Sequence, residues 1–375
     1  MNNEQNEDIV QNKIMTDEES QNTEQIGSEE ISSEEISSED VEMDDESPKK
    51  KGFHINIHII LIAAIVVILG VAAYELISWN KGEHIVLDPN EDTSEFDIEV
   101  LDELIPMSPS DYEGHAFDDE TTVLLLGNGD LSMSRNDENA IDKLIAEGAG
   151  VTVYNAAFPY PTLATRNLAM IEQNYPDDIY SLTYIADAIV SGDFSEIDRV
   201  TEKYHVDGNF TQDAAKVLKA IDYDNLDVIV IMYDASDYFQ GRAIENPKDD
   251  EERCTIVGSL NYSIRRIKEA YPYIRIIVSS LYYTEGTNED GSKYDPDQVD
   301  TGNGTLSNYF YNALNTCTEL SVSYIDNFYG TINQENYKEY VDLSGETDYI
   351  KLTDAGRKKL AERISYAIKK YPQDK

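Results

Sequence analysis

Three short groups of polar residues in this sequence have the types and spacing that could do chemistry. Gly127-Asn128-Gly129-Asp130 ends one apolar run, Asp234-Ala235-Ser236-Asp237 ends another, and Asp348-Tyr349-Ile350-Lys351 precedes the last amphipathic stretch. A hydroxyl, a base and a carboxylate that meet in one place can attack an ester carbonyl. Acyl transfer from an ester is therefore the chemistry that groups of these types and spacing could carry out.

Five apolar runs would form the strands that position these groups. A short continuous apolar run that ends in a polar or glycine turn is typical of a strand buried on both faces. In an open α/β sheet the carboxyl ends of parallel strands share one edge, and ligands bind there. The predicted strands are Thr122–Leu126, Val151–Ala156, Asp227–Tyr233, Ile274–Leu281 and Val322–Ile325.

Helical periodicity separates the apolar runs. Asn136 or Asp137 would cap a first helix that ends at Gly148. Strands that alternate with helices predict an α/β fold, a single three-layer domain over residues 115–375 with a five-stranded parallel sheet. The other predicted helices are Thr165–Gln173, Ser181–Val190, Thr211–Ile221, Glu251–Ala270, Leu306–Leu320 and Thr353–Lys369.

The order and strand context of the three polar groups resemble the SGNH (GDSL-type) hydrolases over roughly residues 120–370. In that family the first strand ends in Gly-Asp-Ser or Gly-Asn-Ser, whose Ser is the nucleophile. The third strand ends in Gly-x-Asn-Asp, whose Asn supplies an oxyanion donor, and a late Asp-x-x-His supplies the base and its orienting acid. The resemblance implies a flavodoxin-like domain and activity on esters.

The first two groups depart from the family pattern. Gly129 stands in the position of the nucleophile, and a glycine has no side chain to attack a carbonyl. Asp234 stands where the family has Gly, and Ser236 stands where it has the oxyanion Asn; only Asp237 matches. A carboxylate at Asp234 would repel a developing oxyanion. No glycine lies between Asn155 and Thr165 to replace the second oxyanion donor.

The last group keeps the acid and loses the base. Asp348 matches the family, but Lys351 stands in the position of the His. A lysine is protonated near neutral pH unless burial or another cation lowers its pKa, and nearby carboxylates do the opposite. We therefore interpret Lys351 as a salt-bridge partner of Asp348, and of Asp234 where it reaches that far. The replacement of nucleophile, oxyanion Asn and base by Gly129, Ser236 and Lys351 predicts lost or much reduced esterase activity.

An alternative is an active ester hydrolase with a displaced nucleophile. Ser132 lies three residues past Gly129, and a small change of register would bring it near Lys351 as a Ser–Lys dyad. The simpler interpretation, which we favour, is an ordinary turn or cap serine.

The chain before the predicted domain divides into three segments. Residues 1–51 hold many acidic residues and no aromatic residue, which predicts a disordered acidic cytoplasmic tail. Residues 52–79 contain an apolar stretch long enough for a transmembrane helix, and Lys49-Lys50-Lys51 places the amino terminus inside. Cleavage as a signal peptide after Ala73 is the alternative. Residues 80–114 would form a stalk or linker, or an edge segment of the domain.

Composition narrows the partners. A formal charge of −45 disfavours nucleic acid and anionic lipid. No metal-ligand spacing or cofactor motif is present, and Cys254 and Cys317 could form one bridge or stay free. We expect a single-pass cell-membrane protein with an extracytoplasmic SGNH-like domain that binds a cell-surface glycan or a protein. A non-enzymatic protein that couples the acidic tail to the ectodomain is a further alternative.

Overall fold

The computed structural model describes residue 70 and residues 100–167, 173–205, 209–345, 347 and 349–373. Asp92–Lys375 form one compact unit, separate from Met1–Glu91. The predicted tail 1–51 and the predicted span 52–79 lie outside the described residues, apart from Gly70. Within the described ranges, no helix has the length and apolar character needed to cross a membrane.

A five-stranded sheet forms the middle of the unit. Its order is β2-β1-β3-β4-β7, and every neighbouring pair is parallel. The central strands are runs of Val, Ile and Leu that are buried on both faces, as expected of a parallel sheet covered by helices. The strands are β1 (Thr122–Gly127), β2 (Thr152–Asn155), β3 (Val228–Met232), β4 (Arg275–Ser279) and β7 (Ser323–Ile325).

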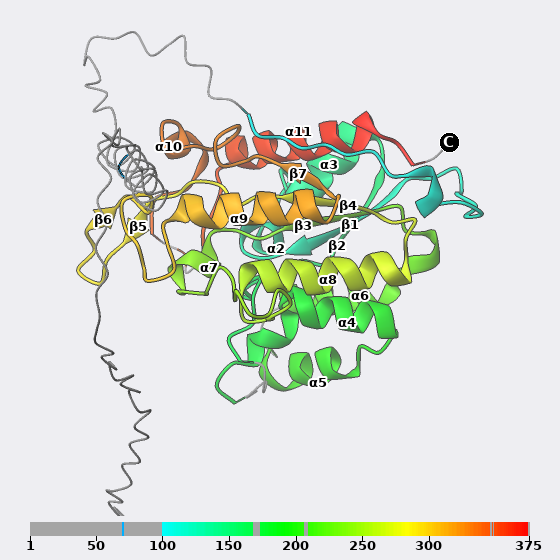
Figure 1. The fold of residues 1–375 in the computed structure, drawn as a ribbon, viewed down its shortest axis with the longest axis horizontal. Helices are drawn as coiled ribbons and strands as arrows, with labels where there is room; N and C mark the ends of the chain where they lie inside the picture. The colour runs from blue at the N-terminus through cyan, green and yellow to red at the C-terminus, as the bar shows by residue number, and fades with distance from the viewer. Residues whose placement is uncertain are drawn as a thin grey trace, which may run out of the picture. The chain divides into compact units, whose positions relative to one another are not determined.

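Helices cover both faces of this sheet (Figure 1). On one face α3 (Ile141–Ala149) packs against α11 (Asp354–Lys370), and on the other α8 (Ile256–Ala270) packs against α9 (Leu306–Glu319) and α4 (Leu182–Ser191). The remaining helices are α2 (Asp130–Met133), α5 (Ser195–Tyr204), α6 (Asn209–Ala220), α7 (Ser236–Phe239) and α10 (Tyr337–Tyr340), with 3₁₀ turns at Pro109–Asp111, Pro176–Tyr180 and Tyr223–Asn225.

The longest helices begin at side-chain caps. The Thr255 hydroxyl accepts the amide of Gly258 at the start of α8, and the Thr353 hydroxyl accepts the amide of Gly356 at the start of α11. Each cap satisfies an amide that the helix leaves without an internal partner.

A two-stranded hairpin, β5 (Gly286–Thr287) with β6 (Lys293–Tyr294), lies between β4 and α9 in the sequence.

Part of the predicted stalk packs on the edge of the sheet. Glu103 forms an antiparallel bridge with Tyr324 of β7, through amide-to-carbonyl hydrogen bonds of 3.0 and 2.7 Å. The amide of Leu101 donates to the Asp326 carboxylate at 3.0 Å. Within segment 80–114, residues 101–105 therefore behave as an edge segment of the domain, which leaves β7 with a covered edge.

The α/β fold class, the parallel sheet and the helices near α4, α6, α9 and α11 are confirmed, two local predictions are wrong, and a third is described only in part. Neither Asn136 nor Asp137 caps α3, whose N-cap is Ala140 with no side-chain hydrogen bond. The helix predicted from Glu251 begins at Ile256, because Thr255 caps it there. Within Thr165–Gln173, residues 165–167 are not helical, and 168–172 lie outside the described residues.

Candidate functional site

Two glycines shape the turn after β1, at the carboxyl edge of the sheet. A Cβ on Gly127 would lie 1.8 Å from the carbonyl oxygen of Met232, so only glycine lets β1 and β3 approach this closely. Gly129 has φ 55° and ψ −128°, a conformation that side chains disfavour, and it precedes α2. Its amide donates to the carbonyl of Pro159 at 3.1 Å, so this N–H is already occupied.

Asp234 fills the space where a nucleophile would begin. A Cβ built on Gly129 would lie 2.4 Å from Oδ2 of Asp234, closer than any real contact. Asp234 follows β3 and is 7% exposed. The nucleophile position therefore lacks a side chain and, in this arrangement, has no room for one.

The two oxygens of Asp234 are used unequally. Oδ1 accepts hydrogen bonds from the Asn128 side chain at 3.0 Å, the Ser236 amide at 2.9 Å and the Ser236 hydroxyl at 2.5 Å. Oδ2 is buried and has no hydrogen-bond partner among the described residues. Burial raises the pKa of Asp234, and the bonds from Ser236 and Asn128 oppose this. Ser236, at the oxyanion Asn position, directs its hydroxyl at a carboxylate.

Asn128 joins the first turn to two others. Its side-chain oxygen accepts the amide of Asp234 at 2.9 Å, and its side-chain nitrogen also donates to the carbonyl of Pro161 at 2.8 Å. Pro161 belongs to the loop after β2. One buried amide therefore ties the carboxyl ends of β1, β2 and β3 together.

Asp237 holds the same loop from the β3 side. Its carboxylate accepts the amides of Leu163 and Ala164 at 2.8 and 3.0 Å. Burial raises the pKa of Asp237 to about 7, although these amide bonds pull it down. Asp237 follows β3, and its described contacts position a loop.

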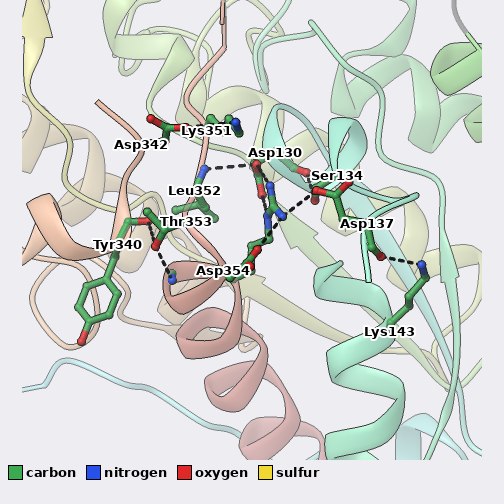
Figure 2. A network of polar contacts seen from close by, with 12 residues as sticks. Asp130, Ser134, Asp137, Lys143, Tyr340, Asp342, Lys351, Leu352, Thr353 and Asp354 are labelled. Atoms are coloured by element: carbon green, nitrogen blue, oxygen red, sulfur yellow. Dashed lines mark hydrogen bonds and ion pairs between the residues drawn. The ribbon is translucent and has the colours of Figure 1, made fainter. Parts of the chain in front are cut away.

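A buried ion pair connects the first turn to the start of α11. Arg357 Nε lies 2.8 Å from Asp130 Oδ2, and Arg357 Nη2 lies 3.1 Å from Asp130 Oδ1. The amide of Leu352 also donates to Asp130 at 3.2 Å, as Figure 2 shows. Arg357 is 3% exposed and also contacts Asp137 at 2.8 Å. This network holds the segment that carries Lys351 against the turn after β1.

Lys351 pairs with a residue that the sequence did not single out. Its Nζ lies 3.1 Å from Asp342 Oδ2, and both residues are labelled in Figure 2. The hydrogen bond and charge of Asp342 raise the pKa of Lys351, so it stays protonated. The expected contact with Asp234 is absent among the described residues, because Lys351 turns toward solvent while Asp234 is buried. Asp348 lies outside the described residues.

Ser132 lies on α2, the short helix that directly follows the turn after β1. It is fully buried, and its hydroxyl accepts the Arg135 guanidinium at 3.1 Å. Arg135 also donates to the carbonyl of Ser132 at 3.0 Å. In the described part of the chain, no base contacts this hydroxyl.

A pocket of about 400 Å³ opens beside the turns, which is the size of a small-molecule site. We call it the edge cleft. Its walls include Ser236, Phe239, Thr287 and Tyr349, together with Ile350, whose carbonyl lies 4.0 Å from the Cβ position of Gly129. The cleft therefore adjoins the position that a nucleophile would occupy.

The charged groups that line the edge cleft are paired. Glu285 lies 3.4 Å from Lys293, and Asp342 lies 3.1 Å from Lys351. A bound ion would have to break one of these pairs, so the lining favours a neutral ligand with hydrogen-bonding groups.

Further features bear on cofactors and redox chemistry. No cluster of three potential metal ligands occurs among the described residues. Cys254 and Cys317 are both free thiols, and Cys317 is buried, so the bridge that the sequence allowed does not form. Sequence reasoning missed the roles of Asn128, Asp342 and Arg357. The only sequence signal for these roles was the Gly-Asn-Gly-Asp turn, because polar side chains that follow a buried strand need hydrogen-bond partners.

Comparison with known proteins gives structural likeness alone. No protein family and no curated protein matches the sequence. Among solved structures, the carbohydrate acetylesterase Est24 from Sinorhizobium meliloti has 13% identity and a TM-score of 0.38, over 66% of this chain and 98% of that chain. A GDSL-like lipase candidate from Bacteroides ovatus has 12% identity and a TM-score of 0.40, over 68% of this chain and 100% of that chain.

A third solved structure, assigned by its description to the G-D-S-L family of lipolytic proteins, comes from Desulfitobacterium hafniense. It has 13% identity and a TM-score of 0.36, over 66% of this chain and 99% of that chain. The likeness to GDSL and SGNH hydrolases expected from the sequence is thus found among solved structures. At these scores it carries no argument about activity, which has to come from the site itself.

Proposed function

We propose that this domain is an SGNH-like fold without serine-dependent ester hydrolysis, and that it uses the edge cleft to bind a ligand. One observation carries the proposal: Gly129 has no side chain, and Asp234 occupies the space that a side chain there would need. An acyl-transfer enzyme requires a nucleophile within hydrogen-bond reach of a base. Neither requirement is met around Gly129, where Lys351 pairs with Asp342.

The alternative is an ester hydrolase of surface polymers that uses Ser132. The contacts of Ser132 count against it, because its hydroxyl is fully buried, is bound by Arg135 and contacts no base in the part of the chain that the structure describes. Activity through Ser132 would require α2 to move and Arg135 to release the hydroxyl.

The ligand that we propose is a neutral cell-surface glycan, with a protein partner as the alternative. Paired charges and hydroxyl groups line the edge cleft, and the aromatic residues Phe239 and Tyr349 also face it. Rings of this kind pack against the apolar faces of sugars, while hydroxyls and carboxylates bind their polar edges. We further propose that residues 52–79 anchor the protein as a single membrane span, with its amino terminus inside and this domain extracytoplasmic.

A chromogenic acetyl ester tests the loss of hydrolysis. The purified unit Asp92–Lys375 and its Ser132→Ala variant should both turn over the ester at the buffer rate. Turnover by the wild-type protein that disappears in Ser132→Ala would establish the alternative and reject our proposal.

A glycan array tests the binding function. Wild-type protein should bind neutral glycans, and Tyr349→Ala should lose this binding because Tyr349 lines the cleft. Tyr366→Ala is the matched control, since Tyr366 is 52% exposed on α11 and outside the cleft. Equal loss in both variants would show that binding does not involve the cleft.

A further inference from the structure

A second cavity lies at the opposite edge of the sheet from the candidate site. It has a volume of about 410 Å³ and is lined by the amino-terminal ends of β4 and β7, the end of α8 and the segment that covers the β7 edge. Met107, Ile274 and Val322 are among its apolar lining residues. A volume of this size with mainly apolar walls matches a small organic molecule rather than a few water molecules.

Two cations, Lys268 and Arg275, line this mainly apolar cavity. The Lys268 ammonium donates to the carbonyl of Leu320 at 2.8 Å, and no ion pair involves it among the described residues. Asp111 also lines the cavity, but no ion pair joins it to either cation in the described ranges. Two cations that have no carboxylate partner among the described residues are unexpected in a chain of net charge −45.

Arg275 is the more demanding of the two cations because it is 2% exposed. Its guanidinium donates to the carbonyls of Ala367 and Tyr371 at 2.9 and 3.0 Å, and to the Ser323 hydroxyl at 3.3 Å. Its Nε is buried and has no hydrogen-bond partner among the described residues. Burial lowers the pKa of Arg275 to about 10, because the charge is held away from water and no carboxylate pairs with it among the described residues.

The end of α11 compensates this charge only in part. The carbonyl end of a helix carries roughly half a negative charge, whereas a guanidinium carries a full positive one. A buried charge without a partner is strongly unfavourable, so the uncompensated positive charge of Arg275 would stabilise an anion in the cavity. Lys268 on the cavity wall adds to the same preference.

We propose that this cavity binds a small apolar molecule that carries one anionic oxygen group, for which a medium-chain carboxylate is the simplest example. The apolar walls receive the hydrocarbon part, and the lining cations Lys268 and Arg275 attract the carboxylate. The site is separate from the edge cleft, so it stands whether or not the proposed function is correct.

Isothermal titration of the unit Asp92–Lys375 with octanoate, 1-octanol and acetate tests the proposal. Octanoate should bind at least tenfold more tightly than either of the other two, because only octanoate has both parts of the ligand. Equal binding of octanol would show a merely apolar cavity, and absence of octanoate binding would overturn the proposal outright.

Variants of Lys268 locate the binding without disturbing the buried Arg275. Lys268→Gln should weaken octanoate binding by about fivefold, the factor for a partly exposed ion pair of about 1 kcal/mol. Lys268→Arg should retain it, and Lys216→Gln, on the exposed surface of α6, should leave it unchanged. Tyr349→Ala in the edge cleft should also have no effect. Binding that is insensitive to Lys268→Gln would refute the assignment.

Discussion

Replacing Gly129 with alanine tests directly whether Asp234 occupies the nucleophile position. The substitution adds one Cβ to a residue with φ 55° and ψ −128°, at a point 2.4 Å from Asp234 Oδ2. The backbone conformation alone costs a side chain about 1–3 kcal/mol. Overlap with a buried carboxyl adds about 1–3 kcal/mol, the usual cost of overpacking a core. We therefore expect the free energy of unfolding to fall by roughly 2–6 kcal/mol.

A double-mutant cycle separates the two contributions. Asp234→Ala removes the carboxyl group and costs about 1–3 kcal/mol by itself, because it leaves the donors of Asn128 and Ser236 without their acceptor. In that background Gly129→Ala should cost only the backbone part. The coupling between the two substitutions should therefore be favourable by about 1–3 kcal/mol.

Denaturant unfolding of the unit Asp92–Lys375 measures all four proteins of the cycle. Gly192→Ala is the matched control, because Gly192 has φ 68° and nothing within 4 Å of its Cβ position. It should cost about 1–2 kcal/mol, the ordinary penalty for a left-handed alanine. If Gly129→Ala costs the same with and without Asp234, then Asp234 does not fill this space, and the reasoning behind the lost nucleophile fails.

Two further predictions concern the ties between the turns. Arg357→Met should lower the free energy of unfolding by about 3–5 kcal/mol because it leaves Asp130 as an unpaired buried carboxylate, and Asp130→Asn/Arg357→Met should recover at least about 1 kcal/mol in urea unfolding. The pKa of Asp237 is about 7 in the folded state and about 3.9 in the unfolded state, so between these pH values the folded state binds more protons. The contribution of Asp237 should therefore lower the free energy of unfolding by up to about 4 kcal/mol as pH rises from about 4 to about 7. Asp237→Asn should remove this part of the slope in unfolding measured across that range, and an unchanged slope would contradict the assignment.

The fold was accessible from the sequence because its signals are local. Runs such as Val228–Met232 are long enough and apolar enough to be buried strands whatever lies beside them. The failures are also local in origin. Asn136 and Asp137 have good capping side chains, but α3 begins four residues past Asp137, where Ile141 reaches the core. Core packing thus decided where this helix begins, against the preference of the cap.

The site was only partly accessible. The sequence located the turns at one edge of the sheet, since that follows from strand order. It did not identify Asp342 as the partner of Lys351, or Arg357 as the partner of Asp130, because each pair is set by tertiary contacts. From the sequence, Asp342 and Asp348 are equally plausible partners of Lys351 until the conformation of the loop between them is known.

The polar groups at this edge contact one another, which supports the proposed loss of ester hydrolysis. Asp130 is neutralised by Arg357, Asp237 holds two loop amides, and Lys351 is bound by Asp342. A base or an oxyanion donor must have a free lone pair or N–H aimed at the reacting atom. These groups instead satisfy one another, which stabilises the edge as a fixed surface.

Asp234 Oδ2 is the exception, because it is buried without a hydrogen-bond partner among the described residues and is directed at Gly129. If ionised, it would oppose any negative charge that developed nearby, by about 4 kcal/mol at 4 Å for an effective dielectric constant of 20. That is comparable to what a whole oxyanion-hole donor contributes, with the opposite sign. A serine placed at position 129 would therefore still face a carboxylate at the point where catalysis needs a donor, so Gly129→Ser alone would not supply the esterase activity that we propose is lost.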